Sequence, residues 1–212
     1  MLAGLPDGRL HVRYLAAGDA EAALVVTPGG QRVWVWDGRG DAAALARQAG
    51  GRVDLALGPD VAALWPAARP VTPEELPPGG VVRLADGVTL TRLDAGEGWA
   101  LRLAYRDFST LLPAGLAQDA QAALAQRHGA AGVRLTVLKT PSAGSGAWPG
   151  VQLLALTEPQ TVLWPEDTTY PPDVDAWLTA HGAVRVASAA AVEVTTDGAR
   201  YWVEPACRGC AR

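Results

Sequence analysis

Side chains that could bind a catalytic metal ion are few in this 212-residue chain. It has three histidines, His11, His128 and His181, and no two of them are four residues apart, the spacing that puts two ligands on one helix face. His128 and His181 each precede a glycine at a predicted helix end, where an imidazole can interact with the last carbonyl groups. We therefore expect no histidine-based metal centre.

The two cysteines, Cys207 and Cys210, form one Cys-x-x-Cys pair close to the C-terminus. A structural zinc ion takes four ligands, so one pair supplies half a site unless a second chain supplies the rest. A redox pair is expected beside a strand–helix junction, whereas this pair follows the last predicted strand. The sequence favours a frayed C-terminal tail over residues 205–212.

Carboxylates and hydroxyl groups are the remaining candidates for catalysis. Glu21, Asp37 and Asp60 could hold a hard cation if they converged on one pocket. Ser142 and Ser145 lie in a glycine-rich loop, but the Gly-x-Ser-x-Gly pattern of a serine nucleophile is absent from the sequence. The Gly-x-x-x-x-Gly-Lys-Ser/Thr phosphate loop is absent as well.

Aromatic and basic side chains point to binding as a different class of function. Trp34 and Trp36, two of eight tryptophans, share one face of a predicted strand. Tryptophan can stack on single-stranded bases, although burial in a core is its commoner role. Four cations could form a basic rim that contacts nucleic acid, or a solvated surface: Arg102, Arg106, Arg134 and Lys139. The formal net charge of −4 argues against a uniformly basic nucleic-acid binder.

The apolar pattern predicts a single mixed α/β domain that would position these residues. Apolar residues make up 49% of the chain, enough for a large core. Strands are predicted at 10–15, 22–27, 32–36, 53–57, 81–84, 88–93, 99–105, 108–112, 133–138, 161–164, 184–187, 192–195 and 201–204, and helices at 41–48, 117–128 and 173–180. Five prolines between 66 and 80 predict a loop. Two mixed sheets with helices outside would accommodate this order.

The N-terminus has no signal-peptide pattern, and no run approaches the roughly 20 apolar residues that span a bilayer. As a stand-alone protein the chain is expected in the cytoplasm. If it is part of a longer membrane protein, we expect a membrane-associated or extracytoplasmic location.

The order of segments resembles the metallo-β-lactamase-like domain of the ComEC-type competence proteins. Residues 15–24, followed by the Thr-Pro-Gly-Gly of residues 27–30, resemble a family strand ending Leu-Asp-Val-Gly-Gln-Gly-Asp-Ala and a following Thr-Pro-Gly-Gly. Residues 35–38 resemble the family's Leu-Ile-Asp-Gly-Gly. Residues 137–145 resemble its Val-Leu-Lys-Val-Pro-His-His-Gly-Ser.

Further matches follow in the family's order. Residues 99–112 resemble the strand pair that ends Phe-Leu-Leu-Thr-Gly-Asp, and residues 170–183 resemble the family's last helix and its flanks. Residues 192–198 resemble its closing strand and turn. The resemblance covers about residues 9–204 and implies a four-layered αββα fold, formed as a single metallo-β-lactamase-like domain over residues 1–204.

The same resemblance implies that the family's metal ligands are missing. Its His-x-His-x-Asp-His cluster would follow the strand at 53–57, where this chain has no histidine and one acid, Asp60. Gly115 stands at the family's Asp, and Ser142 and Ala143 stand at its His pair. Pro171 or the next proline stands at its last His. The relic of the cleft would comprise Glu21, Asp37, Asp60, Gly115, Ser142, Ala143, Ser145 and Pro171.

These features predict a catalytically inactive domain without a cofactor. It would act as a binding or structural module linked to DNA uptake, with DNA at a local patch or a protein as its partner. The alternative is a hydrolase or nuclease that uses a relocated or single-metal site near Glu21, Asp37 and Asp60.

Overall fold

A computed structural model describes residues 6–17, 20–96, 98–112, 116–129, 133–140, 149–165, 169, 171–188 and 191–205. These residues form two seven-stranded sheets, which we call sheet A and sheet B. Among them, no helix is long and apolar enough to cross a membrane.

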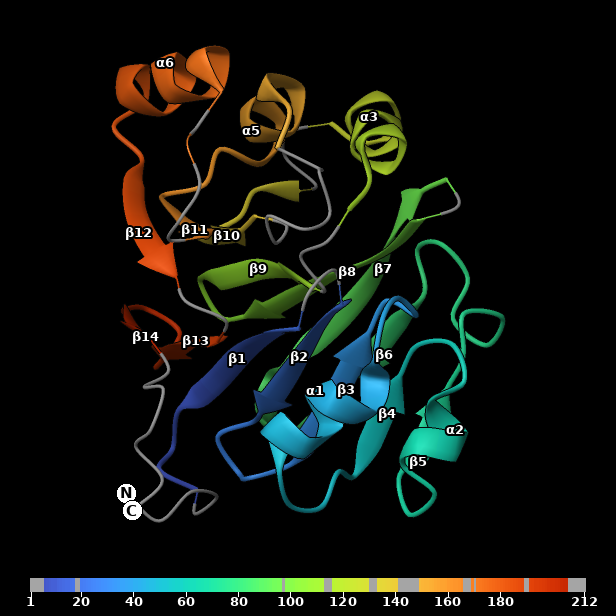
Figure 1. Ribbon diagram of the computed structural model, residues 1–212. Helices are drawn as coiled ribbons and strands as arrows, with labels where there is room; N and C mark the ends of the chain where they lie inside the picture. Colours follow the sequence, from blue (N-terminus) through green and yellow to red (C-terminus); the bar gives the residue numbers. More distant parts are fainter. Residues whose placement is uncertain are drawn as a thin grey trace.

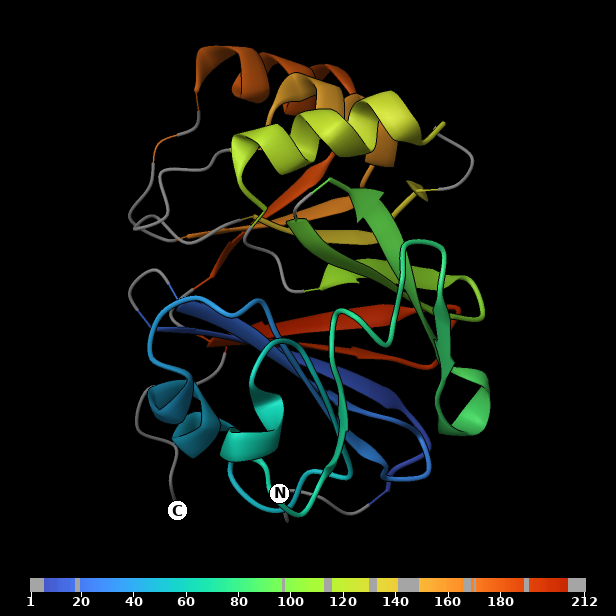
Figure 2. The same cartoon turned by 90° about the vertical axis from the view of Figure 1, so that its right-hand side faces the viewer.

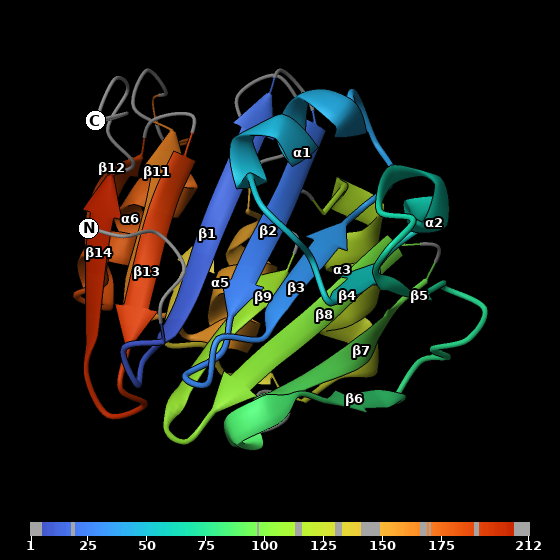
Figure 3. The ribbon, with the colours of Figure 1, turned by 90° about the horizontal axis from the view of Figure 1, so that it is seen from below.

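Sheet A has the spatial order β14-β13-β1-β2-β3-β4-β5 (Figure 3). Its strands are β1 (Leu10–Ala17), β2 (Ala20–Val26), β3 (Arg32–Trp36), β4 (Leu55–Leu57), β5 (Arg69–Val71), β13 (Ala191–Thr196) and β14 (Tyr201–Pro205). The pairs from β14 to β3 are antiparallel, whereas β3, β4 and β5 run parallel. The sheet is therefore mixed.

Sheet B has the order β12-β11-β10-β9-β8-β7-β6 and is also mixed. Its strands are β6 (Val81–Arg83), β7 (Thr89–Ala95), β8 (Gly98–Tyr105), β9 (Phe108–Leu112), β10 (Val137–Lys139), β11 (Thr161–Pro165) and β12 (Val184–Ser188), with a 3-10 turn η1 (Ala85–Gly87) after β6. The pairs from β6 to β9 are antiparallel, and those from β9 to β12 are parallel.

Helices cover the outer faces of both sheets (Figures 1 and 2). On sheet A lie α1 (Ala42–Ala49) and α2 (Val61–Leu64); on sheet B lie α3 (Gln118–Arg127), α5 (Val151–Thr157) and α6 (Pro172–Ala180). One apolar cluster fills the space between the sheets, and two others lie beneath the two helix layers. This four-layered αββα arrangement confirms the predicted fold class.

Side-chain alternation in β3 shows how the layers arise. Val33 and Val35 point into the cluster between the sheets, whereas Trp34 and Trp36 pack beneath α1 and α2. Trp34 is fully buried, with its ring centroid 5.6 Å from that of Trp65. Trp34 and Trp36 therefore belong to the core beneath the helices. A strand that is buried on both faces needs apolar residues at every position.

Several predicted boundaries were wrong. The proline-rich stretch predicted as a loop contains β5, which exists because its backbone pairs with β4. The strand predicted at 133–138 begins only at Val137, and no helix was predicted at α5 or at the four-residue α2. Short elements such as these depend on their neighbours, so the sequence pattern indicates them weakly. The predicted N-cap of α1 is confirmed, because the Asp41 carboxylate accepts from the Ala44 N–H at 3.0 Å.

Candidate functional site

Two of the predicted carboxylates lie together at one edge of the sandwich. Ala22 of β2 is paired with Trp36 of β3, so the next residues along, Glu21 and Asp37, face each other across the two strands. Both share the face of Ala23 and Val35, which point between the sheets. The two strands thus bring Glu21 and Asp37 side by side; a functional cleft at these acids stays a prediction.

A cation from the opposite sheet neutralises the first of these acids. Lys139 ends β10, and its Nζ lies 2.7 Å from Glu21 Oε1. Only 6% of the lysine side chain and 4% of the glutamate side chain are exposed. The contact therefore crosses the interior from sheet B to sheet A. Sequence reasoning missed it because the two residues are 118 positions apart.

The second acid is held by its own loop. The Asp37 carboxylate accepts from the Arg39 backbone N–H at 3.0 Å and from Arg39 Nε at 2.8 Å, and its side chain is 7% exposed. Burial raises the pKa of Asp37 above its usual value; the contacts with Arg39 oppose this shift, and the nearby Glu21 charge adds to it. Each acid thus has a cationic partner of its own.

The third acid of the predicted set is exposed, unlike this buried pair. Asp60 is exposed at the start of α2, where its backbone adopts a left-handed conformation (φ 51°) and its side chain makes no capping hydrogen bond. Across the described ranges, no three His, Cys, Asp or Glu side chains come close enough together to hold a metal ion. Pro171 lies at the N-terminus of α6.

Six residues named from the sequence lie outside the described residues: Gly115, Ser142, Ala143, Ser145, Cys207 and Cys210.

The site that is described does not fit the divalent metal of a metallo-β-lactamase fold. Such a metal needs several ligands that converge without a competing positive charge. Here the Lys139 ammonium lies against Glu21, and the Arg39 guanidinium lies against Asp37. A metal bound by either acid would compete with these cations for the carboxylate oxygens.

The predicted basic rim is partly wrong. Lys139 is buried against Glu21, so its ammonium does not face solvent. Arg106 is exposed at the β8–β9 turn, where it lies over the Tyr105 ring and donates to the Asp197 carbonyl at 2.9 Å. Arg102 and Arg134 do lie together, beside a hollow of about 250 Å³. Contact of these arginines with nucleic acid stays a prediction.

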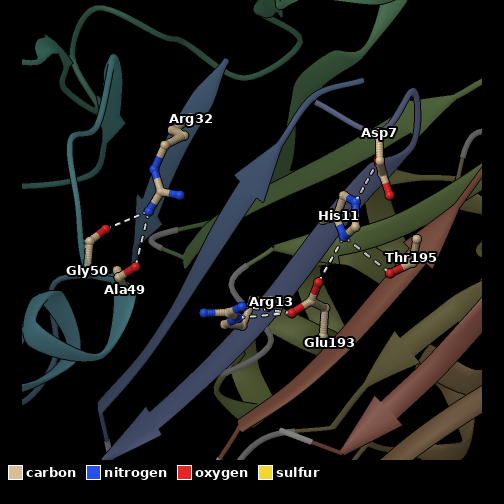
Figure 4. Close-up of polar contacts among 8 residues, drawn as sticks. All are labelled: Asp7, His11, Arg13, Arg32, Ala49, Gly50, Glu193 and Thr195. Carbon is tan, nitrogen blue, oxygen red and sulfur yellow. Dashed lines mark hydrogen bonds and ion pairs between the residues drawn. The ribbon is translucent and has the colours of Figure 1, made fainter. Parts of the chain in front are cut away.

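A polar network that the sequence did not indicate lies on the outer face of sheet A (Figure 4). His11 Nδ1 lies 2.8 Å from Glu193 Oε1, and His11 Nε2 lies 3.0 Å from Asp7 Oδ1. Arg13 donates to Glu193 Oε2 through Nη2 at 2.9 Å and through Nε at 3.1 Å. β1 and β13 pair antiparallel and bring Glu193 against His11 and Arg13, which are 182 and 180 positions away in the sequence.

The charges of this network perturb each other. Hydrogen bonds from His11 and Arg13 lower the pKa of Glu193 to about 2, against the effect of burial. The hydrogen bond to Glu193 raises the pKa of His11; burial opposes the shift, and Asp7 adds to it. The network is half-buried and its charged groups are paired with one another, so it fits a structural role better than a catalytic one.

No protein-family model and no curated protein matches the sequence. Among solved structures, the chain is similar to a Thermotoga maritima protein assigned to the Zn-dependent hydrolases of the metallo-β-lactamase superfamily. The two share 9% sequence identity at a TM-score of 0.44, over 81% of this chain and 85% of that one. The layered fold described above rests on the sheet order and helix packing of this chain itself.

Proposed function

We propose that this chain is a catalytically inactive domain of the metallo-β-lactamase type, which acts as a binding or structural module. The observation that carries the proposal is the buried ion pair between Lys139 and Glu21, at 2.7 Å. The Lys139 ammonium neutralises the Glu21 carboxylate, a role that a bound metal ion would otherwise fill at this edge. The domain would extend over residues 1–204, with residues 205–212 as a tail.

The arrangement around Asp37 supports the same proposal. A metal-bound water needs an open coordination position, and a general base needs access to that water. The Asp37 carboxylate is almost fully buried and is engaged by Arg39 through two hydrogen bonds. The carboxylate oxygens of Glu21 and Asp37 therefore do not face solvent, where a metal ion and its water would bind. The alternative of a relocated hydrolase site near Glu21, Asp37 and Asp60 is disfavoured because Asp60 is exposed and, across the described ranges, no three acidic, histidine or cysteine side chains gather to hold a metal ion.

A link to DNA uptake is part of the proposal and rests on the resemblance to ComEC-type domains. The partner would be DNA at a local patch or another protein. Arg102 and Arg134 are the cations of the predicted rim that lie side by side. Binding through them would weaken steeply with salt, since association with phosphates releases counterions.

The test combines metal analysis with an activity assay. We expect the purified chain, incubated with Mn²⁺ or Zn²⁺ and desalted, to hold no stoichiometric metal and to leave single- and double-stranded DNA uncut. The same metal analysis and cleavage assay are run on Lys139→Gln, which removes the cation paired with Glu21. Arg52→Gln is the control because the Arg52 side chain is 79% exposed. Stoichiometric metal together with DNA cleavage by the unaltered chain would refute the proposal.

A further inference from the structure

A small hollow on the helix-facing side of sheet B is the starting point. Arg102 of β8 is paired with Leu111 of β9, which packs beneath the helices, so both point to that side of the sheet. The hollow has a volume of about 250 Å³ and is lined mostly by polar residues, including Arg102, Ser109, Thr136 and Gln160. This volume is below the range of pockets for drug-sized ligands and suits one small group.

Arg102 is a half-buried cation without a carboxylate partner among the described residues. Its only hydrogen bonds there are two long ones, both 3.4 Å, from Nε and Nη2 to the Arg134 carbonyl oxygen. Burial lowers the pKa of the guanidinium, because the charged form loses water without gaining a counter-charge. An anion in the hollow would offset that loss.

Four charged residues line the hollow, and two of them form an ion pair with each other. Arg134 also lines the hollow, and its guanidinium lies 2.7 Å from Glu158 Oε2, so these two charges balance each other. Arg102 is the cation left over. Asp107 lines the rim from the exposed β8–β9 turn, and its negative charge would oppose an anion.

We propose that this hollow binds a small oxyanion, a phosphate group in the first instance, with Arg102 as its charge partner. Guanidinium groups hold phosphate through paired N–H donors, and the side-chain amide of Gln160 could add a further donor. The phosphate could belong to a free small molecule or to a nucleic-acid strand. The site is separate from the Lys139–Glu21 edge, so its failure would leave the proposed absence of catalysis untouched.

The first experiment measures thermal unfolding in phosphate and in chloride at equal ionic strength. We expect phosphate to raise the Tm of the unaltered chain, Arg102→Gln to abolish the rise, and Arg102→Lys to keep part of it. Asp107→Asn should enlarge the rise because it removes a like charge. Arg52→Gln is the matched control, since it removes an exposed arginine elsewhere and should leave the rise intact.

The Tm of Arg102→Gln in chloride should be no lower than that of the unaltered chain, because the lost charge has no carboxylate partner. If this variant fails to fold, a phosphate titration of the unaltered chain followed by NMR takes its place. Amide signals of Ser109, Thr136 and Gln160 should then shift together. A missing phosphate-specific Tm rise, a rise that survives Arg102→Gln, or unmoved amide signals would each overturn the proposal.

A second arm identifies the source of the phosphate. A fluorescent single-stranded oligonucleotide is titrated by anisotropy at two salt concentrations, with and without inorganic phosphate. Arg102-dependent binding that phosphate displaces assigns the site to a nucleic-acid strand. A phosphate effect on Tm without oligonucleotide binding assigns it to a small molecule.

Discussion

Sheet A takes part in two ion pairs that differ in solvent exposure. At the strand edge, the Glu21–Lys139 pair lies between the sheets with side chains no more than 6% exposed. On the outer face of β1 and β13, the Arg13–Glu193 pair has side chains that are 34% and 25% exposed. A buried charge that loses its partner is far more costly than an exposed one. We therefore expect the loss of one partner to lower the free energy of unfolding much more at the Glu21–Lys139 pair than at the Arg13–Glu193 pair.

Removal of Lys139 is expected to have the largest effect. Lys139→Met leaves the Glu21 carboxylate buried between the sheets, and we expect the free energy of unfolding to fall by about 3–5 kcal/mol. Urea denaturation measures this change. The double variant Glu21→Gln/Lys139→Met should recover most of the loss, because it removes both charges. A loss below about 1 kcal/mol for the single variant would contradict a tightly buried pair.

A neutral polar contact between the sheets provides an intermediate case. Tyr14 of β1 is buried, with 3% of its surface exposed, and its hydroxyl is hydrogen-bonded to Thr110 Oγ1 of β9. Thr110 Oγ1 donates to the Val137 carbonyl at 2.8 Å, so the tyrosine hydroxyl is the donor. Thr110→Val should cost about 1–3 kcal/mol by leaving this hydroxyl unpaired. In a double-mutant cycle with Tyr14→Phe, additive losses would show that the two side chains are not coupled.

The half-buried network of His11, Arg13 and Glu193 should contribute less to the free energy of unfolding. Glu193→Gln weakens the contacts with His11 and Arg13, and we expect a loss of about 1 kcal/mol at neutral pH that shrinks in high salt. The pKa of Glu193 is lowered to about 2, so its stabilising effect is present above pH 4.5 and is lost as the pH falls toward 2. The free energies of unfolding of the unaltered chain and of Glu193→Gln should therefore converge as the pH falls toward 2. Curves that stay parallel down to pH 2 would argue against this linkage.

The smallest effect is expected at His11. Its pKa is raised above 6.5, so the stabilisation from its charged form is complete below pH 6.5 and is lost as the pH rises through the folded-state value. An NMR titration of the imidazole should give a pKa above that of a model histidine, and Asp7→Asn should lower it. Equal pKa values for His11 in the unaltered chain and in Asp7→Asn would show that Asp7 does not affect the His11 imidazole.

Sequence patterns predicted most of the long elements and the layering. They identified β1, β3, β8, β9 and the three longest helices, because these carry regular apolar spacing and clear turn residues. They failed at β5, where a three-residue strand containing a proline is fixed by backbone pairing with β4. They also failed at Lys139, whose place in a predicted basic rim depended on an exposure that the fold does not provide.

The sequence by itself determined the layered α/β fold class and the scarcity of histidine, because side-chain alternation and composition are properties of the chain alone. Only the tertiary structure decided what Glu21 and Glu193 touch. Lys139 reaches Glu21 from the other sheet, and Glu193 reaches His11 from near the opposite end of the chain. Burial and partner choice set the strength and the use of a charge, and both depend on contacts between residues far apart in sequence.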